Sequence, residues 1–169
     1  MFEEWKTEPD SHSWVHNGYA CHIQRMNRSK ALNGYVAIPA GHPLHNVEYC
    51  APLPASIKAL NDEVMSGPAG GRSPIQLFTM SADSPRAGDQ FDVHGGVTYS
   101  GVGYWLPKSG DQGFWYGFDC SHHGDLSPGY DFTRRHANEY RNIAFVTAEC
   151  ESFADQLAHA QSITGVNHA

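Results

Sequence analysis

Apolar and polar residues alternate with a period of two in two neighbouring segments of the chain. Residues 90–101 (QFDVHGGVTYSG) place Asp92 and His94 on the side opposite two apolar residues, and residues 113–121 (GFWYGFDCS) are strongly aromatic up to Asp119. A period of two is typical of β-strands. Because consecutive strands are usually neighbours in space, we expect these strands to pair and Asp92, His94 and Asp119 to share one face of a sheet.

The N-terminal half is expected to contain a β-hairpin followed by a helix. Residues 14–26 and 35–39 are rich in apolar and aromatic residues and are joined by a polar stretch, a pattern typical of a hairpin. Residues 54–66 begin with proline, repeat their apolar residues at helical spacing and run into glycines, which predicts a helix. A short strand is expected at residues 75–80.

The clearest helical pattern lies near the C-terminus, over residues 138–157, where Asn138 is the expected N-cap. Its apolar positions recur three and four residues apart, as on one buried face of a helix. They are Ile143, Val146, Thr147, Cys150, Phe153, Ala154 and Leu157. Glu149, Glu151 and Asp155 then fall on the solvated face, although Glu149 is also a candidate to reach a site.

These elements predict one α+β domain over residues 1–169. We expect an aromatic-rich antiparallel sheet, packed by the C-terminal amphipathic helix and by the shorter helix. A chain of 169 residues is long enough to bury a core of its own without metal or disulfide staples.

The composition restricts the partners of the chain. With 11 lysines and arginines against 18 acidic residues, its formal charge of −7 argues against nucleic acid and anionic membranes as partners. The four cysteines are scattered, which favours reduced thiols, and the first residues are acidic where a secretion signal would be basic and apolar. We therefore expect a cytoplasmic protein with free thiols and no membrane partner, and the oligomeric state is left open.

Candidate chemistry is concentrated where the two central strands end. Asp92, His94, Asp119 and His122 combine carboxylate and imidazole groups, which suit a divalent metal such as zinc or manganese. Asp125 follows in the same segment and is a candidate ligand-binding residue. The spacing matches no established metal motif, so a hydrogen-bond network that fixes the loop is the alternative.

A glycine pair interrupts the first of these strands. Gly95 and Gly96 allow close approach of a ligand or of another backbone, and Thr98 adds a hydroxyl group. We expect this segment, together with His42 from an earlier Gly/Pro turn, to contact a small polar ligand, with or without a phosphate group. A β-bulge required only for sheet curvature is the alternative.

Nucleophilic catalysis and arginine-mediated phosphate binding have weaker support. Cys120 lies beside histidines in the sequence, but the strand alternation places it with the buried aromatic residues. Arg134 and Arg135 follow aromatic residues and could bind a phosphate, whereas surface salt bridges are the more ordinary role of such a pair.

Four motifs carry a resemblance to a known family. They are AIPAGHP, DVHGGVTYSG, WYGFDCSHHGD and YRNIAFVTAECESFADQL. Together they resemble a family of small uncharacterised proteins of bacteriophages and prophages, whose specific elements are HGG and GFDxxHxGD. The resemblance implies a bacterial host cell as the setting and, by analogy of context, a role against host immunity, but it assigns no catalytic residues.

Three functions remain open from the sequence. The leading hypothesis is a phage-type protein that binds a small nucleotide-derived signal and so counters host defence. The second is a metal-dependent hydrolase that uses the Asp/His cluster to activate water. The third is an inhibitor of a host protein by surface contact, with the polar cluster purely structural.

Overall fold

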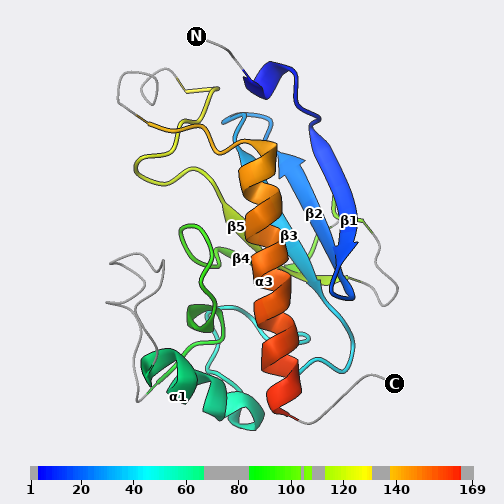
Figure 1. The fold of residues 1–169 in the computed structure, drawn as a ribbon, viewed down its shortest axis with the longest axis vertical. Helices are drawn as coiled ribbons and strands as arrows, with labels where there is room; N and C mark the ends of the chain where they lie inside the picture. The colour runs from blue at the N-terminus through cyan, green and yellow to red at the C-terminus, as the bar shows by residue number, and fades with distance from the viewer. Residues whose placement is uncertain (1–3, 67–83, 104, 108–112, 131–137, 165–169) are drawn as a thin grey trace.

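The computed structural model describes residues 4–66, 84–103, 105–107, 113–130 and 138–164, which form an α+β domain (Figure 1). One antiparallel sheet contains five strands in the order β1-β2-β3-β5-β4. The strands are β1 (Ser11–His16), β2 (Tyr19–Arg25), β3 (Leu32–Ile38), β4 (Tyr99–Val102) and β5 (Phe114–Asp119). The helices are α1 (Lys58–Ser66), α3 (Ile143–Ile163) and the short 3-10 helices η1 (Glu4–Lys6), η2 (Ala55–Ile57) and η3 (Gly88–Gln90). The predicted fold class is therefore confirmed.

The first hairpin of the sheet lies inside a segment that the sequence pattern predicts as one strand. Residues 14–26 contain the end of β1, a turn at Asn17 and Gly18, and all of β2. The φ angles of the two turn residues are +48° and +82°, the left-handed pair that a two-residue hairpin loop requires. The Asn-Gly pair was the sequence signal for this turn, and the prediction of a single strand was wrong. The one hairpin that the sequence predicted is the next along the chain, between β2 and β3, and it is confirmed.

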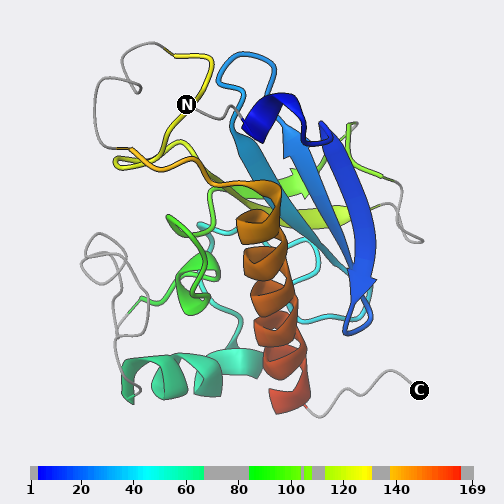
Figure 2. The same ribbon diagram turned by 45° about the horizontal axis from the view of Figure 1, so that its top comes forward.

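Helix α3 packs lengthwise against one face of the sheet (Figures 1 and 2). Its buried residues are Val146, Cys150, Phe153, Ala154, Leu157 and Ala160, which follow the predicted periodicity. The helix begins after Asn142, whose side chain accepts a hydrogen bond from the Phe145 N–H at 3.0 Å. The N-cap is therefore Asn142, whereas the sequence predicted Asn138. The helix continues to Ile163, beyond the predicted end at residue 157.

The other face of the sheet carries a smaller aromatic cluster. Tyr35 and Trp115 are buried there with Ala37 and Leu106, and the Tyr99 ring stands edge-on to Tyr35 at a centroid distance of 5.6 Å. Because β5 alternates between the two clusters, its aromatic residues are buried on both faces, as its sequence suggested.

The segment before β4 is not a strand, although its sequence alternates like one. Of the expected strand at residues 90–101, only the part from Tyr99 onward pairs, with β5. Residues 91–98 instead run beside α3, where the Gln156 side chain accepts from the Asp92 N–H at 2.7 Å and donates to the Asp92 carbonyl at 2.9 Å. Side chains of the helix thus replace a neighbouring strand, and the alternation reflects burial against α3.

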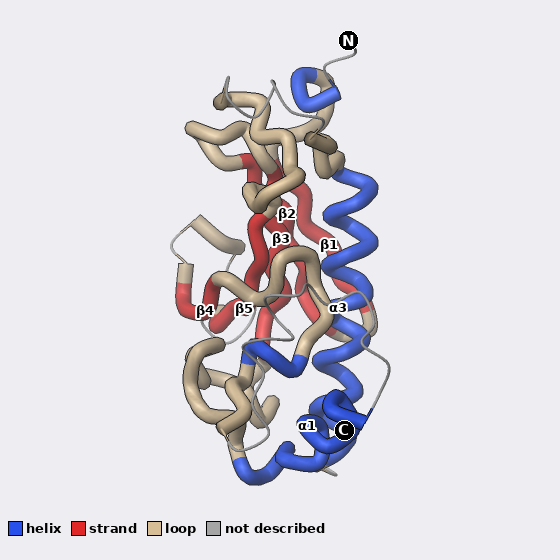
Figure 3. Tube along the Cα trace, turned by 90° about the vertical axis from the view of Figure 1, so that its left-hand side faces the viewer, coloured by secondary structure: helices blue, strands red, loops and turns tan. Residues whose placement is uncertain are grey.

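The remaining elements extend beyond the ends of the sheet (Figure 3). The expected helix at residues 54–66 is confirmed as η2 followed by α1, which contacts α3 (Figure 2). All four cysteines are free, as predicted. No helix within the described ranges has the length and apolar character needed to cross a membrane. The strand expected at residues 75–80 and the pair Arg134 and Arg135 lie outside the described residues.

The sheet and α3 are in tight contact at Gly34, which gives a test of the packing. A β-carbon at this position would overlap the Phe118 ring and lie 2.7 Å from Cys150 Sγ. We expect Gly34→Ala to destabilise the protein by about 1–3 kcal/mol, because a well-packed core accepts an added methyl group only by shifting its neighbours. Thermal unfolding measures the change. The control Ser11→Ala, on the exposed edge strand, should stay within about 0.5 kcal/mol, and equal melting of the two variants would contradict the packing.

Candidate functional site

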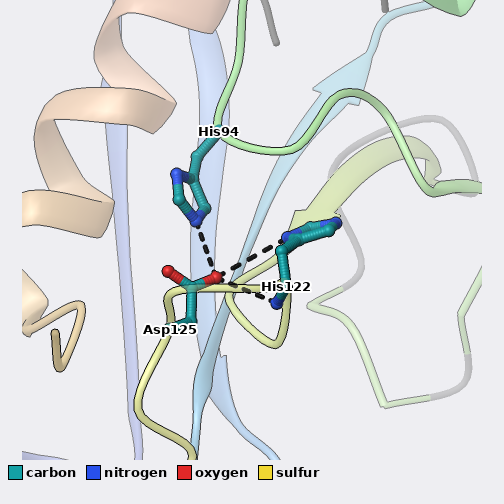
Figure 4. A group of neighbouring side chains, drawn as sticks. All are labelled: His94, His122 and Asp125. Carbon is teal, nitrogen blue, oxygen red and sulfur yellow. Dashed lines mark hydrogen bonds and ion pairs between the residues drawn. The ribbon is translucent and has the colours of Figure 1, made fainter. Parts of the chain in front are cut away.

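Three segments far apart in the sequence meet around the carboxylate of Asp125. His94 belongs to the turn before β4, His122 and Asp125 belong to the loop after β5, and Arg141 immediately precedes Asn142, the N-cap of α3. Figure 4 shows both histidines directed at Asp125. The His94 Nε2 atom lies 2.8 Å from Asp125 Oδ2, and Arg141 donates from Nε to Asp125 Oδ1 at 2.9 Å.

The glycine pair forms the turn that presents His94. The Gly96 N–H donates to the Val93 carbonyl at 2.9 Å, and Gly95, with φ of +70°, occupies the third position of this turn. A positive φ at that position is typical of a type II turn and favours glycine. A β-carbon on Gly95 would also overlap the His122 ring. The close approach expected at the glycine pair is therefore made by His122, and the glycine pair forms a turn where the alternative was a β-bulge.

Asp125 is a buried carboxylate that is fully hydrogen-bonded. Its side chain is 1% exposed, and Oδ2 also accepts from the His122 backbone N–H at 3.0 Å. Burial alone would raise the pKa of Asp125, but the nearby His122 ring, the hydrogen bonds from His94 and Arg141, and the His122 backbone N–H outweigh it and hold that pKa well below its usual range. Asp125 is therefore ionised at every physiological pH.

The imidazole of His122 lies between two carboxylates without a hydrogen bond from its Nδ1 atom. Nδ1 is 3.7 Å from Asp125 Oδ2 and 3.8 Å from Asp119 Oδ1, ion-pair distances that are too long for hydrogen bonds. Among the described residues it has no hydrogen-bond partner, although the atom is buried. The neighbouring Asp125 carboxylate raises the pKa of His122, with Asp119 adding to it, against the opposing effect of burial.

His94, His122 and Asp125 could together hold a metal ion. One ligand atom from each residue lies within 4.8 Å of the others. Two imidazoles and one carboxylate suit zinc or manganese, and three protein ligands leave a coordination position for water or substrate. Arg141 would remain on the second carboxylate oxygen, an outer contact of the kind that fixes the orientation of a metal ligand.

The structure brings together part of the predicted metal set. His94 and His122 meet, and Asp119 reaches the site only through His122. Asp119 and His94 do not share a sheet face. Phe118 packs toward α3, so Asp119, the next residue of the strand, faces away from the helix. The His94 ring instead packs against Phe145 of α3. That expectation was wrong.

The predicted metal ligand Asp92 is not part of the His94/His122/Asp125 group. Its backbone is instead hydrogen-bonded on both sides by Gln156 of α3. The third member of the group is Asp125, which the sequence placed in the same Asp/His cluster as a ligand-binding residue.

Two of the other predicted ligand-binding residues lie outside the cluster. Thr98 is exposed, and its N–H donates to the Gly117 carbonyl at 2.9 Å, which continues the pairing of β4 with β5. His42 is buried, and its Nε2 lies 3.0 Å from the Leu157 carbonyl of α3. Leu157 is twelve residues along α3 from Phe145, roughly 18 Å at the helical rise, so His42 supports the helix at its other end.

Cys120 is unsuited to nucleophilic catalysis. Its side chain is buried, and burial raises the pKa of its thiol well above the ordinary value, an effect that the nearby Asp125 and Asp119 carboxylates increase. The thiolate, which is the reactive form, is therefore disfavoured, as the sequence alternation suggested.

Sequence reasoning missed Arg141 and understated the role of Glu149. The Glu149 carboxylate accepts from the His94 backbone N–H at 2.8 Å and so fixes the start of the glycine turn. Arg141 stands alone before the helix, and no spacing connects it to Asp125. Its only sequence signal was its position in the first turn of the helix predicted over residues 138–157, with a cluster of carboxylates and histidines earlier in the chain.

Comparisons of the chain with protein-family models, with curated proteins and with solved structures found no match. The resemblance to a phage family therefore stays a prediction.

The buried carboxylate gives a stability prediction. Asp125→Asn should destabilise the protein by about 3 kcal/mol at pH 7, because it leaves Arg141 and the two histidines without their anion. That corresponds to roughly 6–12 °C in the thermal midpoint. The matched variant Asp119→Asn, at a carboxylate that is 30% exposed, should have a much smaller effect.

The same variant has a predictable pH dependence. A lowered pKa means that the stabilisation by Asp125 is present above the unfolded-state value of about 4 and is lost as the pH falls below it. The difference in melting between the wild type and Asp125→Asn should therefore shrink from pH 5 toward pH 2. A difference that stays constant over this range would show that the charge of Asp125 is not what stabilises the fold.

Proposed function

We propose that the chain is a metal-dependent hydrolase, with a divalent zinc or manganese ion held by His94, His122 and Asp125. One observation carries the proposal: three ligand atoms converge within 4.8 Å, and one of them, His122 Nδ1, is buried without a hydrogen bond in the described part of the chain. Unsatisfied buried nitrogens are rare in folded proteins, and coordination of a metal is one reason for them.

The residues around the cluster have distinct parts in this proposal. The metal, when bound, supplies a polarised water at its open position. Glu149 and the glycine turn hold His94 in place, and Arg141 keeps one Asp125 oxygen occupied so that the other faces the two histidines. Asp119 is 30% exposed and near His122, so it is the carboxylate best placed to accept a proton from that water.

The substrate class in this proposal is a small polar, phosphorylated molecule. It follows from the sequence hypothesis of a nucleotide-derived ligand. In this proposal the resemblance to a phage family gives the setting, and the protein acts in the cytoplasm of the bacterial host. The competing hypothesis, that such a ligand is bound without turnover, uses the same residues. A purely structural cluster in a protein that inhibits a host target is the third possibility.

Metal binding is the first test. After treatment with a chelator, the protein should bind one equivalent of Zn²⁺ or Co²⁺, measured by calorimetry and by the cobalt absorption spectrum. His122→Ala should lose more than about 100-fold in affinity, since changes to residues that only support metal ligands cost about 10–100-fold. The exposed neighbour His123 provides the control His123→Ala, which should bind normally. Equal affinities of the two variants would refute the site.

The affinity should also depend on pH in a defined direction. Because its carboxylate neighbours raise the pKa of His122, a proton competes with the metal up to a higher pH than for an ordinary histidine. Affinity should therefore rise between pH 6 and pH 8, by up to about tenfold per pH unit while one proton is displaced. A flat profile would exclude His122 as a ligand.

Turnover is the second test. The metal-loaded protein is incubated with a panel of mononucleotides, cyclic nucleotides and dinucleotides, and products are separated by chromatography. Asp119→Asn should lower kcat by about 10²–10⁴-fold and leave metal affinity unchanged, if Asp119 accepts the proton. Recovery of intact ligand with the protein would favour binding without turnover, and neither result would favour the inhibitor.

A further inference from the structure

A second candidate site lies along α3, away from the metal cluster. It is a groove of about 700 Å³, within the range of small-molecule sites. Its described lining residues are His16, Leu60, Glu63, Val64, Gln90, Phe91, Glu151, Ser152, Asp155, Gln156 and His159. They come from α1, from α3, from the end of β1, and from η3 with the residue that follows it; Figure 2 shows α1 beside the C-terminal part of α3.

The groove is negatively charged. Three carboxylates line it, and its described lining residues include no lysine or arginine. Glu63 pairs with His159 at 2.7 Å and Asp155 pairs with His16 at 3.0 Å, whereas the ion pair of Glu151 is longer, with the His16 ring at 3.9 Å. Glu151 is therefore the carboxylate with the most capacity for a further cation, and the field of all three favours positive charge.

A buried amide in the lining also lacks a donor. Gln90 is 3% exposed, and its side-chain nitrogen donates to the Arg86 carbonyl at 3.0 Å and to Asn61 Oδ1 at 3.3 Å. The Arg86 carbonyl can only accept, which fixes the orientation of the amide. Gln90 Oε1 then has no hydrogen-bond partner among the described residues. An N–H group brought by a ligand is one way to satisfy such an acceptor.

The rest of the lining is apolar. Leu60 and Val64 of α1 and Phe91 form a hydrocarbon surface beside the carboxylates. We propose that the groove binds an aliphatic amine, with an ammonium group at Glu151, an N–H directed at Gln90 Oε1 and methylene groups on this surface. This site is independent of the metal cluster, so either can fail without the other.

Two probes of equal length and opposite charge test the proposal. In calorimetry at low salt, 1,8-diaminooctane should bind and octanedioate should not. Binding of the diamine should weaken as salt is added, because the carboxylates at the rim are partly exposed. Equal binding of the two probes, or no binding of the diamine, would overturn the proposal.

Variants of the rim locate the binding. Neutralising one partly exposed carboxylate by Glu151→Gln should weaken the diamine about 2- to 5-fold, and Glu63→Gln with Glu151→Gln by more. Asp62→Asn is the matched control, since Asp62 is an exposed neighbour of Glu63 that does not line the groove. If the double variant unfolds at a lower temperature than the wild type, the diamine affinity of Glu151→Gln alone is used to test the site. Unchanged affinity in Glu151→Gln would place the diamine elsewhere and refute the site.

Discussion

The buried negative charge of Asp125 is the constraint on which this end of the molecule depends. An ionised carboxylate at 1% exposure is costly unless hydrogen bonds replace its water. The donors come from three separate segments: the glycine turn through His94, the loop after β5 through His122, and the segment before α3 through Arg141. Satisfying one carboxylate therefore brings these segments together, and the geometry of the candidate metal site follows from it.

The helix that carries this arrangement is anchored by a second charged network. Glu8 accepts from the Ile143 N–H at the start of α3 and from the Tyr140 hydroxyl, while buried Arg25 donates to Tyr140 and to Glu8. These contacts fix the first turn of α3 against β2. Arg141 lies between the two anchored residues, so its guanidinium reaches Asp125 from a fixed backbone.

A sequence pattern predicted the structure correctly where only one kind of structure could produce it. The periodicity of α3 and the aromatic alternation of β5 arise from burial in regular elements, and both were predicted. The alternation at residues 91–98 has another cause, since side chains such as Gln156 and Glu149 take the place of a neighbouring strand. Arg141 could not be predicted, because a single charged residue carries no period and its partner is fixed only by the tertiary fold.

One atom of the cluster supports the proposed ion over a purely structural network. Arg141 donates to one Asp125 oxygen, and two N–H groups, from the His94 ring and the His122 backbone, donate to the other. A structural network around Asp125 is therefore complete without the His122 ring. His122 adds a buried Nδ1 without a hydrogen bond, at a free-energy cost of about 1–3 kcal/mol. Gly95 has no β-carbon and so leaves the space that the His122 ring occupies. The backbone thus holds the His122 imidazole in a position that costs free energy without an ion. A cation bound between His94, His122 and Asp125 would offset that cost.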